Sequence, residues 1–155
     1  GNDDDGRAMQ KSLDKDKIEQ DMVAAALWLK EHEKTTGKLG VVGFCFGGYI
    51  VNFLAASIPD KVDAAVPFYG TPAKQPLVDQ VKGPLLIHFA ENDKRVNATW
   101  EEYKVVLEKN AAEYEAFTYA KAQHGFHNDS TSRYSPKDAE LAWRRTVDFF
   151  DSHLK

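Results

Sequence analysis

The chain has 155 residues, of which 43% are hydrophobic and 28% charged, and its formal net charge is −4. This composition predicts one soluble globular domain that is long enough to bury a core. An acidic balance without a basic block argues against nucleic acid or an anionic membrane surface as a partner. The single cysteine excludes an internal disulfide and agrees with a cytoplasmic location. The alternative is export of a longer parent by an upstream signal.

The first segment of the chain is polar and acidic. Residues 1–15 are expected to be irregular, at the start of a single truncated domain that covers residues 1–155. Asp16 is predicted to cap the first helix with Glu19 three residues later, and Gly37 is predicted to end it. The chain therefore enters its regular structure through one amphipathic helix.

A strand, a tight turn and a helix follow. Residues 39–44 form a short apolar run typical of a buried parallel strand, and residues 49–56 read as a buried helix. The glycines at positions 43, 47 and 48 surround Cys45 in the pattern G-x-nucleophile-x-G, which leaves room for a strained turn. Helix N–H groups and the helix dipole would favour a thiolate there. Cys45 is thus the candidate nucleophile, and a small buried hydrophobic residue is the alternative.

The remainder of the chain alternates strands and helices. Further strands are predicted at residues 64–69, 84–90 and 114–119. Asn97 is expected to cap the helix before the last strand. The closing helix follows Ser135, and its apolar stripe is formed by Trp143, Val147, Phe150 and Leu154. Strands separated by helices require right-handed crossovers, so the fold class is α/β with a parallel sheet of about four strands.

Three chemically matched residues follow three of these strands. Cys45, Asp93 and His124 should gather at one edge of the sheet, because the carboxyl ends of parallel strands meet there. Their order along the chain is that of the α/β-hydrolase fold. His124 would accept the Cys45 proton, and Asp93 would orient the imidazole. Glu91 is the alternative acid, but Asp93 lies beyond the strand end, where its side chain can turn toward the site.

The sequence motifs around these residues are GFCFGG at Cys45, AENDKRV at Asp93 and AQHGFHND at His124. They resemble the motifs of the dienelactone hydrolase family, a carboxymethylenebutenolidase-like group of the α/β-hydrolase superfamily. The resemblance implies hydrolysis of a small lactone or ester through a cysteinyl acyl-enzyme, with the Phe46 backbone N–H as an oxyanion donor. It implies no organic or metal cofactor.

The chain also departs from the family pattern. Complete members have a longer N-terminal half that carries the first strands of an about eight-stranded sheet. The chain therefore resembles the C-terminal part, with a partial α/β-hydrolase fold and an unpaired sheet edge. That edge predicts a partner, either a second copy in a homodimer or the missing N-terminal segment. The alternative to an enzyme is a catalytically impaired fragment that acts only as an association module.

Other side chains are weaker candidates. Tyr69, His127 and Arg133 are expected to contact the substrate, Arg133 through a substrate carboxylate, although a loop arginine or histidine is more often solvated. His88 lies within a strand and reads as a hydrogen-bonded sheet residue. A metal site at His124 and His127 is not favoured, because no third ligand recurs at a suitable spacing. Dinucleotide binding is also disfavoured, since the glycine spacing differs from G-x-G-x-x-G.

Overall fold

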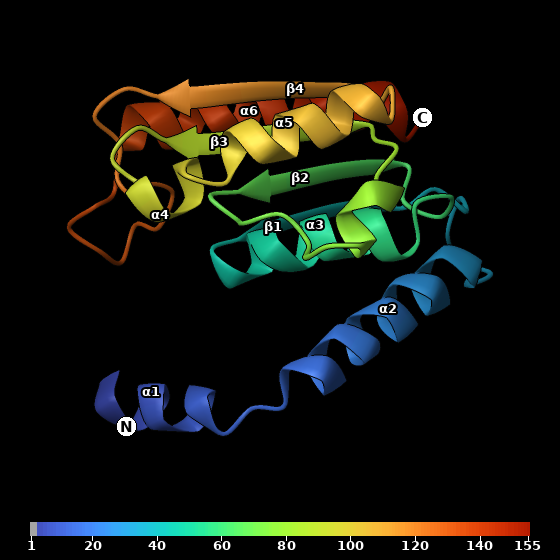
Figure 1. Ribbon diagram of the computed structural model, residues 1–155, viewed down its shortest axis with the longest axis horizontal. Coiled ribbons are helices and arrows are strands. Elements are labelled where there is room, and N and C mark those ends of the chain that lie inside the picture. Colours follow the sequence, from blue (N-terminus) through green and yellow to red (C-terminus); the bar gives the residue numbers. More distant parts are fainter. Residues whose placement is uncertain (1–2) are drawn as a thin grey trace.

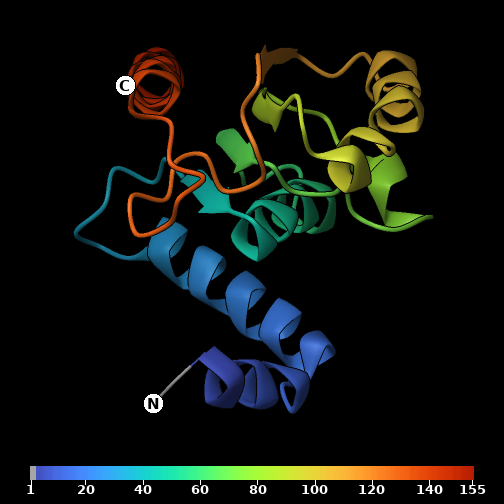
Figure 2. The same ribbon diagram turned by 90° about the vertical axis from the view of Figure 1, so that its left-hand side faces the viewer.

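The computed structural model describes residues 3–155 and shows a parallel sheet between two layers of helices (Figure 1; Figure 2). The strands lie in the order β1-β2-β3-β4, and all three neighbouring pairs are parallel. The elements are α1 Asp3–Lys11, α2 Lys15–Glu31, β1 Gly40–Phe44, α3 Phe46–Ser57, β2 Ala64–Phe68, the 3-10 helix η1 Leu77–Gln80, β3 Leu85–Ala90, α4 Lys94–Asn97, α5 Trp100–Lys109, β4 Tyr114–Tyr119 and α6 Pro136–His153. The predicted α/β class and the four-stranded parallel sheet are confirmed.

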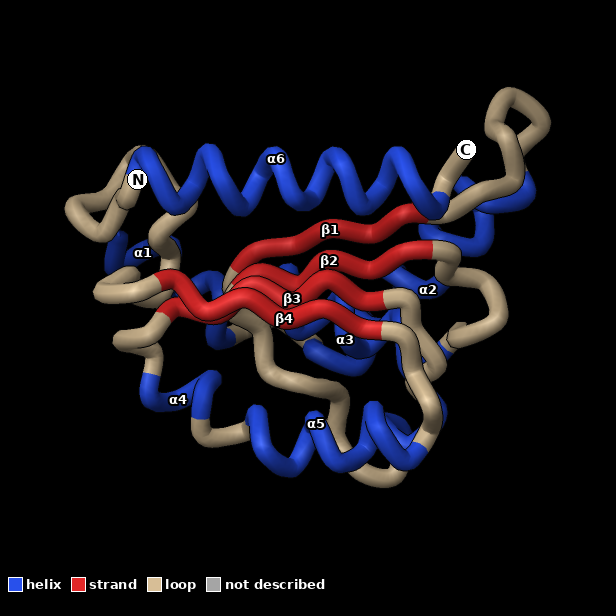
Figure 3. The backbone as a smooth tube through the Cα atoms, turned by 90° about the horizontal axis from the view of Figure 1, so that it is seen from above, coloured by secondary structure: helices blue, strands red, loops and turns tan. Residues whose placement is uncertain are grey.

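The sheet has a hydrophobic core on each face. In β3, Leu85, Ile87 and Phe89 join the core that contains α3 and α5, whereas Leu86 and Ala90 join the core against α6. A strand buried on both faces reads as a continuous apolar run, which explains why the sequence pattern identified it. Figure 3 shows α6 running along one side of the sheet and α5 along the other. Among the described helices, none is long and apolar enough to cross a membrane.

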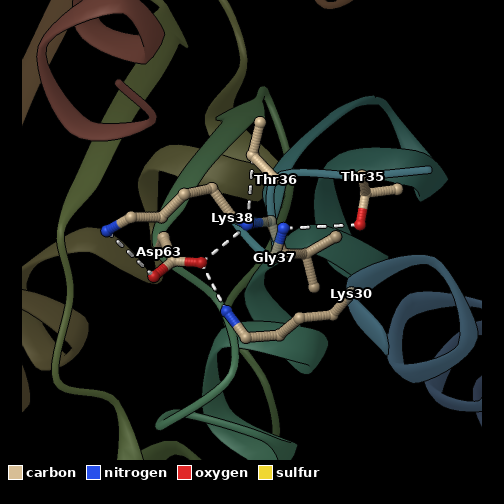
Figure 4. A network of polar contacts seen from close by, with 7 residues as sticks. Lys30, Thr35, Thr36, Gly37, Lys38 and Asp63 are labelled. Atoms are coloured by element: carbon tan, nitrogen blue, oxygen red, sulfur yellow. Dashed lines mark hydrogen bonds and ion pairs between the residues drawn. The ribbon is translucent and has the colours of Figure 1, made fainter. Parts of the chain in front are cut away.

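A polar contact fixes the start of β1 beside β2. Asp63, which precedes β2, accepts hydrogen bonds from Lys30 Nζ at 2.5 Å and from the Leu39 backbone N–H at 2.7 Å (Figure 4). Lys38 Nζ lies 3.7 Å from the same carboxylate. Burial acts to raise the pKa of Asp63, but these donors outweigh it and lower the pKa. One carboxylate thus joins the end of α2 to the first strand and the second.

The beginning of the chain differs from the sequence prediction. Residues 3–11 form the helix α1, so the expectation of an irregular segment over residues 1–15 is wrong there, and residues 1 and 2 lie outside the described part. Asp14, not Asp16, caps α2, because its backbone is extended and its carboxylate accepts from the Lys17 N–H at 3.1 Å. The helix ends at Glu31, before Gly37.

The predicted cap of the helix before β4 is also wrong. Asn97 ends the short helix α4, and α5 begins only after Thr99. The Asn97 amide donates to the carbonyls of Ala90 and Glu91 at 2.9 and 3.1 Å. Asn97 therefore holds the end of β3 instead of capping a helix. A helix-capping pattern in the sequence does not reveal this role.

The closing helix α6 forms as predicted, but the face that it buries is not the predicted apolar stripe. Its buried residues lie next to the stripe positions, and most of them are small: Ala139, Ala142, Thr146 and Phe149. Trp143 and Val147 are 45% and 44% exposed. Phe150 and Leu154 approach Gly40, where an added Cβ would lie 2.6 Å from Leu154 Cδ1. Phe150 and Leu154 thus face β1, whereas Trp143 packs on the His127 ring and stays partly exposed.

Candidate active site

Cys45 occupies a tight elbow between β1 and α3. Its φ of 55° is unusual for a residue with a side chain, and its N–H donates to the Phe68 carbonyl at 3.2 Å. A Cβ at Gly43 would lie 2.2 Å from the Gly47 carbonyl oxygen, so that position requires glycine. A strained turn of this kind presents its side chain at the end of the sheet. Cys45 is exposed there.

Asp93 and His124 meet at the same end of the sheet. Asp93 follows β3 and caps α4, where Oδ1 accepts from the Val96 N–H at 3.2 Å. Its other oxygen, Oδ2, lies 2.5 Å from His124 Nδ1. Asp93 is only 5% exposed, and each of its oxygens has a partner, so the buried carboxylate holds one ring nitrogen of His124.

His124 also contacts Cys45. A hydrogen bond with Cys45 is the largest influence that raises the pKa of His124 above its usual value; partial burial opposes it, and Asp93 adds to it. Because Nδ1 faces Asp93, Nε2 is the nitrogen left for Cys45. Cys45, His124 and Asp93 therefore lie together at one end of the sheet. That arrangement can activate a sulfur nucleophile.

Glu91 points elsewhere. Its Oε2 accepts a hydrogen bond from the Lys121 backbone N–H at 2.7 Å. Glu91 therefore stabilises the turn after β4, whereas Asp93 faces the histidine.

A pocket with a positive lining opens beside Cys45. It has a volume of about 290 Å³ and is lined by Lys15, Cys45, Phe46, Tyr49, Thr71, Pro72, Lys74 and Arg95. Neither Lys15 nor Lys74 is among the candidates predicted from the sequence. Lys74 lies in the loop after β2, and the rule that ligands meet strand carboxyl ends could have identified it. Lys15 comes from the start of α2, and the sequence carries no signal that places it near Cys45.

The three weaker candidates lie in different surroundings. Tyr69 is 1% exposed, and its ring centroid lies 5.0 Å from that of His124, so it packs behind the imidazole instead of opening onto solvent. Arg133 places its guanidinium near Gly125, where Cζ would be 3.7 Å from an added Cβ. His127 stacks 5.0 Å from Phe44. Its Nε2 is buried without a hydrogen-bond partner among residues 3–155, away from the pocket.

His88 has a structural role. Its Nδ1 lies 3.0 Å from the Tyr119 hydroxyl and its Nε2 lies 3.2 Å from Thr146 Oγ1. Burial lowers the pKa of His88 to about 3, so the ring is neutral at physiological pH. The histidine joins β3 to β4 and α6.

A tight elbow at Cys45 after the parallel strand β1, with Asp93 and His124 after later strands, is the arrangement of the α/β-hydrolase fold. The sequence model of the dienelactone hydrolase family matches residues 2–154. The chain belongs to this family, whose members are hydrolases that act on ester and lactone bonds.

Individual relatives agree. A protein of Aquifex aeolicus assigned as a carboxymethylenebutenolidase is 33% identical over 99% of this chain and 69% of its own length. The carboxymethylenebutenolidase of Pseudomonas putida is 33% identical over 83% of this chain and 55% of its own length. A crystal structure assigned as a dienelactone hydrolase from Klebsiella pneumoniae has a TM-score of 0.76 and 26% identity, covering 86% of this chain and 60% of that one. The chain thus spans roughly a half to two thirds of the relatives it matches.

Proposed function

We propose that the chain hydrolyses a small lactone or ester with Cys45 as nucleophile, His124 as base and Asp93 as the residue that orients it. The observation that carries this proposal is the position of His124, which contacts Cys45 and lies 2.5 Å from Asp93. Membership of the dienelactone hydrolase family supports the same class of reaction.

The residues can carry each step. The Cys45 sulfur attacks the carbonyl carbon as His124 takes the thiol proton. The oxygen of the tetrahedral intermediate becomes negative, and the Phe46 N–H at the start of α3 can donate to it. Collapse breaks the C–O bond, and His124 returns its proton to the leaving oxygen. His124 then deprotonates a water that attacks the thioester, which releases the acid product and restores the Cys45 thiol.

The lining of the pocket favours an anionic substrate. Arg95 and Lys74 are exposed and form no ion pair within the described part of the chain, and the Arg133 guanidinium lies outside the pocket beside Gly125, the residue after His124. A carboxylate beside the reacting carbonyl would match these charges. We expect Arg95→Gln to lower kcat/KM roughly tenfold for a carboxylate-bearing lactone and to leave that for its methyl ester unchanged.

Substitution of the triad tests the mechanism. Cys45→Ala and His124→Ala should each reduce hydrolysis of a chromogenic ester or a dienelactone by about a thousandfold or more. Far-UV circular dichroism should show that both variants stay folded. His32→Ala, which removes a histidine remote from the site, is the control and should keep full activity. Full activity in Cys45→Ala would contradict the proposal.

A second candidate function is self-association through the edge of β1. Val42 and Phe44 are 39% and 37% exposed, and an apolar groove of about 490 Å³ between α2, α3 and β1 adjoins them. We propose that a second copy covers this edge, because β1 has no charged side chain and two copies can meet there without repulsion. Light scattering at micromolar concentration should show a dimer. A monodisperse monomer that unfolds cooperatively would contradict the proposal, and so would binding only to an added strand peptide.

A further inference from the structure

The backbone at Tyr69 is held in an unusual conformation beside the triad. Tyr69 follows the last residue of β2, and its φ of 39° lies in the left-handed region that large side chains rarely adopt. Its N–H donates to the His88 carbonyl at 2.8 Å. A Cβ at the next residue, Gly70, would lie 2.2 Å from the Gly48 carbonyl carbon. The chain is therefore pressed against the start of α3 and cannot relax, and such strain tends to be retained where a side chain must be placed accurately.

The ring of Tyr69 fills the space behind His124. Its centroid lies 5.0 Å from the imidazole, with 58° between the planes, and 5.4 Å from the Phe126 ring in an edge-on contact. Aromatic contacts at these distances restrict rotation of both rings. Asp93 holds only one nitrogen of His124, so its hydrogen bond alone leaves the imidazole free to turn about that bond.

The phenol of Tyr69 stays uncharged beside the triad. Burial is the main cause that raises the pKa of Tyr69, and the nearby Cys45 raises it further. A backbone hydrogen bond from His127 and the charge of Arg133 act in the opposite direction. The phenol is therefore neutral at physiological pH and takes no part in proton transfer.

We propose that Tyr69 is a positioning residue: its ring fixes the plane of the His124 imidazole. This role rests on the proposed pairing of Cys45 with His124. It replaces the expectation that Tyr69 contacts the substrate. Removing the ring should let the imidazole leave the line between Asp93 and Cys45 and weaken activation of the sulfur.

Alkylation of Cys45 by iodoacetamide tests this role without a known substrate. The chain has a single cysteine, so the rate reports on that sulfur alone. The rate is measured across pH for the wild type and for Tyr69→Leu, Tyr69→Phe and His124→Ala. Tyr103→Phe is the matched control, because Tyr103 is also buried and donates to Asn52 Oδ1 at 3.1 Å, away from the triad.

Tyr69→Leu should slow alkylation at neutral pH about tenfold and move the pH profile toward that of His124→Ala. Tyr69→Phe keeps the ring and should slow alkylation by less than about twofold. If Tyr69→Leu unfolds, Tyr69→Phe remains as a folded variant, and a slowing in it as large as that of His124→Ala would show that the ring does not position the imidazole. A wild-type profile for Tyr69→Leu, with an altered profile for His124→Ala, would overturn this inference alone. A wild-type profile for His124→Ala would overturn the Cys45–His124 pair and, with it, the role of Tyr69.

Discussion

The two edges of the sheet differ in chemistry. β4 exposes Glu115 and Thr118, whereas β1 exposes Val42 and Phe44 and has no charged side chain. Charged and polar side chains on an outer strand discourage the addition of another strand. The difference indicates that β4 is suited to remain an edge, while β1 has the composition of a strand with neighbours on both sides.

The surroundings of the two edges show the same difference. Near β4, the Arg145 guanidinium covers the Phe117 ring at 3.7 Å and donates to the Tyr119 hydroxyl at 3.1 Å. By contrast, Val42 and Phe44 of β1 and Trp143 and Val147 of α6 remain partly exposed. The Phe117 and Tyr119 rings of β4 are thus covered by the chain itself, whereas the exposed apolar side chains of β1 and α6 are the basis of the proposed dimer.

The largest expected loss of stability comes from the buried face of α6 and not from its partly exposed apolar stripe. Phe149→Ala should lower the free energy of unfolding by about 3–5 kcal/mol at every protein concentration, because Phe149 is buried in the core. Trp143→Ala should cost less than about 1 kcal/mol in dilute solution, with a deficit that grows with concentration as the wild type gains stability from association. Urea unfolding followed by circular dichroism measures both. A large, concentration-independent loss in Trp143→Ala would show that the stripe is already packed within one chain.

Charge placed on each edge tests the comparison directly. Val42→Lys should raise the dissociation constant of the proposed dimer about ten- to a hundredfold, because it loses apolar burial and brings a cation to the contact. Thr118→Lys adds the same charge to β4 and should leave the constant unchanged. Sedimentation velocity across a dilution series measures both constants. Equal weakening by the two variants would mean that overall charge, not the β1 edge, controls association.

The sequence predicted those parts of the fold and site that depend on local pattern. All four strands were identified: the first three are short apolar runs bounded by turn residues, and β4 shows an alternating pattern. Cys45, Asp93 and His124 were placed together because each follows a strand, and strand ends converge in a parallel sheet. Neither the strands nor the placement of these three residues depends on knowing which side chains are in contact.

The rest depends on contacts between distant segments. The stripe on α6 was misjudged because Ala139, Ala142 and Thr146 suit the close approach of the helix to the sheet better than the larger residues do. Lys15 reaches the pocket only because α2 packs against α3. The burial of Tyr69 behind His124 likewise depends on how the loop after β4 folds back. None of these contacts leaves a periodic signal in the sequence.

The smallest expected effect concerns the inner side of β1, which Asp63 ties to β2. Asp63→Asn should lower the free energy of unfolding by about 1–2 kcal/mol at pH 7, because the charged acceptor of the Lys30 and Leu39 hydrogen bonds is lost. The pKa of Asp63 is lower in the folded chain, so its carboxylate stabilises the fold above the ordinary pKa of 3.8. That stabilisation disappears as the pH falls through the folded value, so the difference between Asp63→Asn and the wild type should shrink in acid.

Asp60→Asn is the matched control for this measurement. Asp60 pairs with Lys82 on the surface, and an exposed ion pair of this kind contributes little to stability. Urea unfolding midpoints at pH 7 and at about pH 3 should therefore differ for Asp63→Asn and stay close to the wild type for Asp60→Asn. If Asp63→Asn is neutral at pH 7, the packing of β1 against β2 and α3 suffices to hold the strand. The exposed side of β1 would then be its only weakly held side.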